Sequence, residues 1–235
     1  MPVSPNLAVV IPIYNEEKNI PGLIRDWSPV FKSTGVPYRI ILIDDGSKDG
    51  SLSLLRELQA KDDSLSVCTQ PNAGHGPSIL KGYRMALEAE WVFQIDSDHQ
   101  LDTAAFRELW DNRDRYDLLL AERREKNATL SRQWVSGASG LLVRLLYGRG
   151  VKDVNSPYRL VRAEQLRVAL ERIPPDSFAP NVLLTSWFVL RKNRIFTTVT
   201  EIRKEGLPRQ SKMNPYFLRG VLRSVIQTIQ FRIRR

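Results

Sequence analysis

Residues 93–102, FQIDSDHQLD, change from an apolar run to clustered acids within a few positions. The run WVFQID at residues 91–96 is short, aromatic and apolar, which is typical of a buried strand. Asp96 and Asp98 end it one residue apart, and their negative charges repel each other unless solvent or a cation screens them. A solvated turn is one interpretation of this pattern, and a site for a divalent cation is the other.

Short apolar runs and helical stretches alternate along the chain. Because strands that alternate with helices form βαβ units, the sequence predicts an α/β fold, with a mostly parallel central sheet flanked by helices. We expect one domain over residues 1–212, followed by an amphipathic C-terminal helix over residues 213–235. The expected strands cover residues 7–14, 38–44, 65–70, 91–96, 116–122 and 194–202, and the expected helices cover residues 16–33, 49–62, 76–90, 133–147 and 179–193, with an extended piece and a helix within residues 151–170.

Polar clusters follow the first four expected strands, at the edge where parallel α/β sheets bind ligands. They read YNEE, DDGS, NAGHG and DSD in chain order. Asn15 can cap the helix that follows it, and DDGS can form an ordinary turn. The alternative is that Tyr14 and Glu16 hold the base and sugar of a nucleotide, while Asp44 or Asp45 accepts a hydrogen bond from it.

The formal net charge is +9, and the basic excess gathers from Arg113 onward. Such a charge favours an anionic partner, which can be nucleic acid, anionic lipid or a phosphorylated substrate. Cys68 is the single cysteine, so the chain forms no internal disulfide and no cysteine-based zinc cluster. We therefore expect oxygen ligands for any metal, and we expect His75 to be structural or to face solvent.

The N-terminal residues lack the pattern of a secretion signal, and no stretch has the roughly 18 consecutive apolar residues of a spanning helix. We expect a cytoplasmic protein that is peripherally associated with the membrane.

Four stretches together carry a family resemblance. VVIPIYNEEKNI, ILIDDGSKDGS, NAGHGPSILKGYRMA and QIDSDHQLD, in this order and spacing, resemble the family-2 glycosyltransferases with the GT-A fold, which is Rossmann-like. The resemblance covers roughly the first 125 residues and implies inverting transfer of a sugar from a UDP- or GDP-linked donor, with Mg²⁺ or Mn²⁺ as cofactor. It assigns Asp96 and Asp98 to the metal and diphosphate, and Pro12, Tyr14, Glu16 and Asp44 to the nucleoside.

The second half resembles the dolichyl-phosphate mannose synthase branch and its bacterial polyprenyl-phosphate relatives. The stretches are VKDVNSPYRLVRAEQL and VTEIRKEGLPRQSKMN, and the first has Pro157 where the family motif has glycine. The resemblance implies a polyprenyl-phosphate acceptor held by basic and hydroxyl side chains. The residues expected around it are Arg123 and Arg124 after the fifth strand, Ser156 and Arg159 in the motif, and Arg203, Arg209 and Lys212 near the second stretch. Of the two arginines after the fifth strand, Arg124 is expected to be catalytic.

The chemistry of the acceptor decides whether a base is needed. A phosphate monoester is mostly ionised at pH 7 and attacks without one. A glycan hydroxyl needs a general base, and Asp153 is then the best candidate. The chain lacks the Gln-x-x-Arg-Trp motif of processive polysaccharide synthases, which favours a single transfer. Nucleic-acid binding is the remote alternative, because no recognisable nucleic-acid-binding motif is present and the clustered acids repel phosphate.

The C-terminal stretch is amphipathic. Leu218, Val221, Leu222, Val225, Ile226, Ile229 and Ile233 fall on one helical face, with Arg219, Arg223, Gln227, Gln230 and Arg234 opposite. Packing on the domain is one interpretation, and a helix lying on an anionic membrane surface is the one we prefer. An integral membrane partner is a further possibility.

Overall fold

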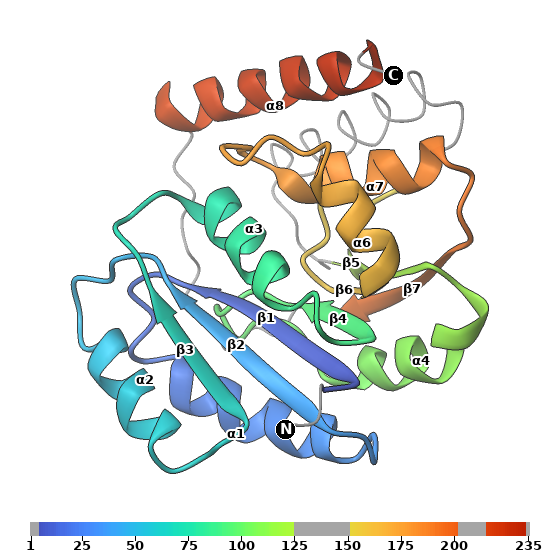
Figure 1. Cartoon of the computed structure of the whole chain (residues 1–235). Helices are drawn as coiled ribbons and strands as arrows, with labels where there is room; N and C mark the ends of the chain where they lie inside the picture. Colours follow the sequence, from blue (N-terminus) through green and yellow to red (C-terminus); the bar gives the residue numbers. More distant parts are fainter. Residues whose placement is uncertain (1–4, 125–150, 202–214, 234–235) are drawn as a thin grey trace.

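A computed structural model describes residues 5–124, 151–201 and 215–233 (Figure 1). A seven-stranded sheet has the order β3-β2-β1-β4-β6-β5-β7. Its strands are β1 (Leu7–Ile13), β2 (Tyr38–Asp44), β3 (Leu65–Thr69), β4 (Trp91–Gln94), β5 (Leu118–Arg124), β6 (Arg159–Arg162) and β7 (Ile195–Glu201). The described helices are α1 (Ile20–Lys32), α2 (Ser51–Gln59), α3 (His75–Met85), α4 (Ala104–Asn112), α6 (Ala163–Leu170), α7 (Pro180–Leu190) and α8 (Pro215–Ile233), with a 3₁₀ turn at Arg113–Arg115.

The sheet is parallel except at β6, which runs antiparallel to both β4 and β5. The central strands are continuous apolar runs, and all seven side chains of β1 are buried. This is the composition expected of strands covered on both faces. The predicted mostly parallel α/β fold is therefore confirmed, and the carboxyl ends of β1 to β4 meet at one edge of the sheet.

Helices cover both faces of the sheet (Figure 1). On one face, α3, α6 and α7 pack over residues such as Val10 and Ile41. On the other face, α1, α2 and α4 enclose an aromatic cluster, in which Phe93 of β4 lies 4.8 Å from Phe106 and 5.1 Å from Tyr158 between ring centroids. Tyr158, from the second half of the chain, thus packs into the hydrophobic core formed by the first half.

Helix α4 is absent from the sequence prediction. Its buried side chains are Ala105, Phe106, Leu109 and Trp110, at a spacing that places them on one helical face. This periodicity could have predicted the helix, but it spans only nine residues next to an acidic loop. The predicted helix over residues 133–147 and the predicted domain boundary at residue 212 lie outside the described residues.

The C-terminal helix α8 lies on the outer side of the α7 layer (Figure 1). Gly220 packs so closely on the ring of Phe178 that an added Cβ would lie 2.4 Å from ring carbons. Thr228 is buried and Phe231 packs against the core. Within the described part of the chain, no helix is both long and apolar enough to span a membrane.

Candidate active site

The loops after β1 and β2 are bonded to each other. The amide of Asn15 donates to Ser47 Oγ at 3.0 Å, and Asn15 Oδ1 accepts from the Lys48 amide at 2.7 Å. Asn15 has a positive φ of 55° and lies four residues before Asn19, the N-cap position of α1. The prediction that Asn15 caps this helix is therefore wrong: its side chain holds the two loops together instead.

Asp44 and Asp45 are both buried and satisfied by internal donors. Asp44 accepts from Thr69 Oγ1 at 2.8 Å, and Asp45 accepts from Gln70 Nε2 at 2.7 Å. Asp45 also accepts from the amides of residues 73 and 74, at 2.9 and 2.8 Å. Gly46 has a φ of +69°, and a Cβ there would lie 2.9 Å from a backbone nitrogen, so the turn requires glycine. These acids fix the loop after β3 against β2.

A cavity of about 260 Å³ opens at the carboxyl ends of β1 and β4. Pro12, Tyr14, Asp45, Asp96 and Asp98 line it, as the sequence analysis expects for a ligand site at this edge. Its remaining lining residues are Ile13, Asn72, Gly74, His75, Ser78 and Ser97. Their mixture of an aromatic ring, carboxylates and small polar groups suits a ligand with a flat base and charged oxygens.

Glu16, also predicted to bind the nucleoside, is buried beside this cavity and is not among its lining residues. Its Oε2 atom accepts from Asn19 Nδ2 at 2.6 Å, and its amide donates to Ser51 Oγ at 2.9 Å. The described contacts thus give Glu16 a part in joining the loop after β1 to the start of α1 and α2. Direct contact with a nucleoside stays a prediction.

Asp96 and Asp98 converge on the cavity with His75 beside them. His75 Nε2 lies 3.4 Å from Asp96 Oδ1, and the two side chains are 56% and 25% exposed. His75 was expected to be structural or to face solvent, and its side chain is indeed largely exposed. It also lines the cavity, because α3 begins there. The loop carrying Asp98 is anchored by His99, whose ring nitrogen lies 3.0 Å from Asp26 of α1.

The donor set fits a hard divalent cation only in part. Within the described ranges, no group of three or more His, Cys, Asp or Glu side chains could hold a metal. The two carboxylates therefore leave most coordination positions of an octahedral Mg²⁺ or Mn²⁺ to oxygen atoms from other sources. This is the usual arrangement where substrate phosphates and water complete the shell.

A buried polar network holds Asp96 from behind. Gln94 is fully buried, and its Nε2 donates to Asp96 Oδ1 at 3.2 Å. Gln94 Oε1 accepts from Tyr83 Oη at 3.1 Å and from Asn181 Nδ2 at 2.8 Å. Burial raises the pKa of the Tyr83 hydroxyl, which therefore stays protonated and donates. The sequence analysis missed these three residues, because the network joins β4, α3 and α7 only in the folded chain.

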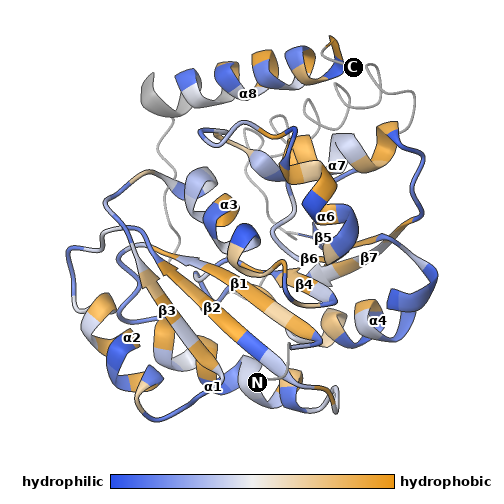
Figure 2. Cartoon of the chain, in the orientation of Figure 1, coloured by the Kyte–Doolittle hydropathy of each residue, from blue (hydrophilic) through white to orange (hydrophobic). Residues whose placement is uncertain are grey.

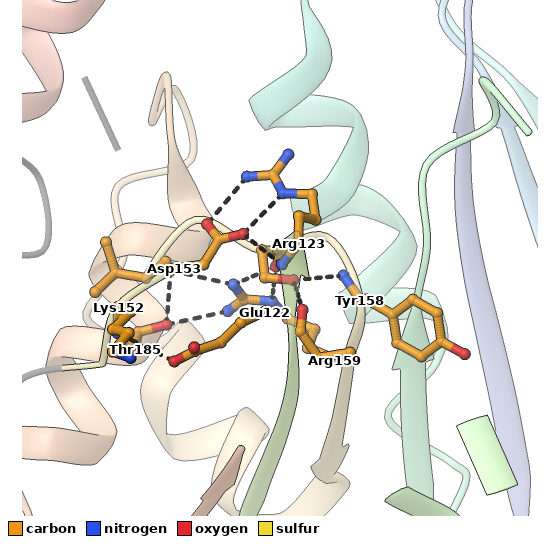
Figure 3. Close-up of polar contacts among 10 residues, drawn as sticks. Glu122, Arg123, Lys152, Asp153, Tyr158, Arg159 and Thr185 are labelled. Carbon is orange, nitrogen blue, oxygen red and sulfur yellow. Dashed lines mark hydrogen bonds and ion pairs between the residues drawn. The ribbon is translucent and has the colours of Figure 1, made fainter. Parts of the chain in front are cut away.

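Arg123 pairs with Asp153 in a bidentate geometry (Figure 3). Its Nε lies 2.8 Å from Asp153 Oδ2, and a terminal nitrogen lies 3.0 Å from Oδ1. Burial alone would lower the pKa of Arg123, but the hydrogen bonds and charge of Asp153, followed by the charges of Asp96 and Asp98, raise it. Arg123 is therefore a fixed cation whose charge acts on the acidic pair.

The sequence analysis named Arg124 as the catalytic arginine. Successive side chains of a strand point to opposite faces, so Arg124 lies on the other face of β5 from Arg123. Arg124 is exposed and lies opposite Glu201 in the register of β7. Arg123 is exposed as well, so the two arginines differ in the face of the strand that they occupy, and Arg123 is the one that pairs with Asp153.

Ser156 and Arg159 lie beneath the surface. Ser156 Oγ donates to the Ala121 carbonyl at 2.6 Å, and both residues are fully buried. The Arg159 guanidinium donates to the carbonyls of Ser156, Val154 and Asn181 at 2.6 to 3.2 Å.

Burial lowers the pKa of Arg159 from its ordinary value. In this structure Ser156 and Arg159 offer no exposed group to an acceptor, contrary to the prediction, because carbonyl groups take up the guanidinium and the hydroxyl. The predicted acceptor residues Arg203, Arg209 and Lys212 lie outside the described residues.

Comparison with known proteins gives the family. An undecaprenyl-phosphate 4-deoxy-4-formamido-L-arabinose transferase of Pseudomonas fluorescens is 27% identical over 230 residues, which cover 97% of this chain and 66% of the relative. The protein of that name from Pectobacterium atrosepticum is 29% identical over 178 residues, which are 74% of this chain and 54% of the relative. The chain thus spans between half and two thirds of the length of these relatives.

A solved structure shares the fold. Glucosyl-3-phosphoglycerate synthase from Mycobacterium tuberculosis, in complex with Mn²⁺ and UDP-glucose, superposes with a TM-score of 0.66 at 22% identity, over 97% of this chain and 79% of that one. The model of the glycosyl transferase family 2 matches residues 8–165. The chain therefore belongs to glycosyltransferase family 2.

Proposed function

We propose that this protein transfers a sugar from a UDP- or GDP-linked donor to a polyprenyl phosphate, with Mg²⁺ or Mn²⁺ at Asp96 and Asp98. The observation that carries the proposal is the convergence of these two carboxylates on the cavity at the ends of β1 and β4. The curated relatives are transferases that act on undecaprenyl phosphate, which supports the acceptor class.

The donor would lie with its base against Pro12 and Tyr14 and its diphosphate toward the acidic pair. The bound cation would neutralise the charge that develops on the departing nucleoside diphosphate. Gln94 and His75 orient Asp96, and His99 anchors the loop that carries Asp98. The chain thus presents both carboxylates with their geometry fixed before the donor arrives.

The negative charge of the acceptor phosphate makes it a nucleophile without the help of a base. A phosphate monoester oxygen, already ionised at pH 7, attacks the anomeric carbon from the face opposite the leaving group. The new carbon–oxygen bond forms as the bond to the diphosphate breaks, the configuration inverts, and the electron pair leaves with the nucleoside diphosphate. Arg123 is the described cation placed to attract the incoming phosphate, because its charge acts on Asp96 and Asp98.

Transfer to a glycan hydroxyl is the alternative, with Asp153 as the general base. Both oxygens of Asp153 accept hydrogen bonds from Arg123, at 2.8 and 3.0 Å. A substrate hydroxyl would have to displace this pair before either oxygen could take its proton, which favours the phosphate acceptor.

The test is release of nucleoside diphosphate from a panel of UDP- and GDP-linked sugars, with Mg²⁺ or Mn²⁺, with and without a short-chain polyprenyl phosphate. We expect release that requires both the cation and the lipid phosphate and that is lost in Asp98→Ala. Lys61→Gln, an exposed change just beyond the C-terminal end of α2, is the matched control and should keep full activity. Transfer only to an added glycan hydroxyl, lost in Asp153→Asn, would contradict the proposed acceptor.

We further propose that α8 binds a membrane surface at the cytoplasmic face. Leu222, Ile226, Ile229 and Ile233 are 60%, 45%, 37% and 74% exposed, and their spacing puts them on one face of the helix. Gly220, Thr228 and Phe231 face the domain, which is the opposite side. Figure 2 shows hydrophilic and hydrophobic residues alternating along α8. A helix that packs on the domain through one face and exposes an apolar stripe on the other suits a position at the membrane–water interface.

Sedimentation with vesicles of phosphatidylcholine and phosphatidylglycerol tests this membrane proposal. Leu222→Gln combined with Ile226→Gln should weaken binding by about tenfold or more, because each apolar side chain withdrawn from water contributes on the order of 1 kcal/mol. Val199→Gln, at a 40% exposed apolar residue of β7, is the control and should bind like the wild type. Equal binding of all three proteins would contradict the role of α8.

A further inference from the structure

A cleft larger than the catalytic cavity lies away from the catalytic edge of the sheet. It has a volume of about 610 Å³ and lies between the C-terminal ends of α6 and α7 and the C-terminal part of α8. Asn181, at the start of α7, bonds Gln94 of the active-site network, whereas Arg191 follows the last residue of that helix and lines the cleft. Asn181 and Arg191 are ten residues apart along the helix, which is a rise of about 15 Å. The cleft is therefore distinct from the sugar-transfer site.

The lining of the cleft is cationic on one side and apolar on the other. Arg172, Arg191 and Lys192 contribute positive charge, with Glu171 as the one acid. No ion pair of the described residues involves Arg172 or Lys192. The apolar lining consists of Val168, Pro174, Trp187, Leu190 and Phe231. An occupant with a negative head and an apolar body complements this lining.

Two further features belong to the lining of the cleft. Lys192 has a φ of +57°, a conformation that favours glycine, yet the chain keeps a lysine there at the mouth of the cleft. Gln227 of α8 also lines the cleft, and its Oε1 atom is buried without a hydrogen-bond partner in the described structure. Buried acceptors of this kind are rare in folded proteins unless a donor reaches them.

The cleft continues toward the outer surface of α8. A second cleft of about 460 Å³ shares Pro174, Gln227 and Gln230 with the first and includes the exposed Leu222 and Ile226. A molecule whose head occupies the first cleft can therefore extend its apolar part along the exposed stripe of α8. Among cellular anions, a phospholipid has this combination of headgroup and chains.

We propose that the cleft between α6, α7 and α8 binds the phosphodiester headgroup of an anionic phospholipid. Arg172 and Lys192 contact the phosphate, and Trp187 and Phe231 pack against the glycerol and the first methylene groups. The site goes beyond the proposed transfer reaction, since neither the donor nor the acceptor occupies it. Binding therefore does not depend on Asp96 or Asp98.

Calorimetric titration of the full chain with dihexanoyl phosphatidylglycerol, kept below its micelle concentration, tests the proposal. We expect saturable binding at least tenfold tighter than that of dihexanoyl phosphatidylcholine or inorganic phosphate. Arg172→Gln combined with Lys192→Gly should weaken it by about tenfold or more, and glycine suits the backbone at residue 192. Lys32→Gln combined with Lys61→Gln removes the same charge from exposed sites on α1 and beyond α2, and should bind normally.

A fluorescence titration locates the bound lipid. The tryptophan emission of the wild type should change on adding the lipid, and Trp187→Phe should lose most of that change, since Trp187 lines the cleft. Asp98→Ala should bind the lipid like the wild type even though it fails in transfer. Equal loss in the two double variants, inorganic phosphate binding as tightly as the lipid, or an unchanged emission signal in Trp187→Phe would each overturn the proposal.

Discussion

Replacing Gln94 with leucine removes the support of Asp96 with little change in side-chain volume. Gln94 loses its hydrogen bonds with Asp96, Tyr83 and Asn181. These three residues differ in whether another hydrogen-bond partner is available to them. Tyr83 Oη still donates to Asn181 Oδ1 at 3.1 Å, and Asp96, 25% exposed, gains water. Among the described contacts, only the Asn181 side-chain nitrogen is left without its acceptor, at a cost of about 1–3 kcal/mol. We expect the free energy of unfolding to fall by about 2 kcal/mol.

The effect on the cation is separate from this loss of stability. Asp96 loses the donor that fixes its carboxylate, and loss of such a supporting contact weakens metal binding by about 10- to 100-fold. We therefore expect the Kd of Mn²⁺, measured by calorimetry in the presence of UDP or GDP, to rise by at least about tenfold. Urea unfolding of the same protein samples gives the stability change.

Tyr83→Phe is the matched control for this prediction. It removes a hydroxyl from the same network, at 3.1 Å from Gln94 Oε1, but no hydrogen bond to Asp96. It should lower the stability and leave the Kd of Mn²⁺ within about twofold of the wild type. If Gln94→Leu loses stability yet binds Mn²⁺ like the wild type, or if Tyr83→Phe weakens Mn²⁺ equally, the positioning role of Gln94 is refuted.

Two further predictions concern the fold that carries the site. In Gly76→Ala the new Cβ would lie 2.0 Å from the Ser177 carbonyl oxygen, so we expect the free energy of unfolding to fall by about 3 kcal/mol, and an unchanged melting temperature would contradict this close approach. Burial raises the pKa of Asp117, but hydrogen bonds from Arg194 lower it below its ordinary value of 3.8 overall. Asp117 therefore stabilises the fold above that pH, and its contribution is lost as the pH falls through the lower folded value. The melting temperatures of wild type and Asp117→Asn should converge between about pH 5 and pH 2, and a constant gap would refute this.

The N-terminal half of the site could be predicted because its signals are local. The residues that line the cavity lie at or within two residues of the end of an apolar run. They are Pro12, Tyr14, Asp45, Asp96 and Asp98. Parallel strands bring their carboxyl ends to one edge of the sheet. The alternation of strand and helix therefore sufficed to gather them. The loop contact of Asn15 was not predictable in this way, because it depends on how two loops meet.

The second half shows the limit of motif reasoning. The sequence shows that Ser156 and Arg159 are polar, but not that carbonyl groups would surround Arg159 and bury it completely. The choice between Arg123 and Arg124 depended on strand phase, and the position of β6 between β4 and β5 was not evident from its four residues. Strand order and side-chain burial depend on contacts between residues far apart in the sequence. Such contacts leave no local pattern in the sequence.

The central claim is transfer of a sugar to a lipid phosphate, and the phosphorus spectrum of the product tests it most directly. The wild type, a short-chain polyprenyl phosphate, Mn²⁺ and the active nucleotide sugar should convert the monoester signal to that of a phosphodiester linked to the anomeric carbon with inverted configuration. Asp98→Ala should leave the monoester unchanged. Consumption of the donor with the lipid monoester recovered intact would contradict the account.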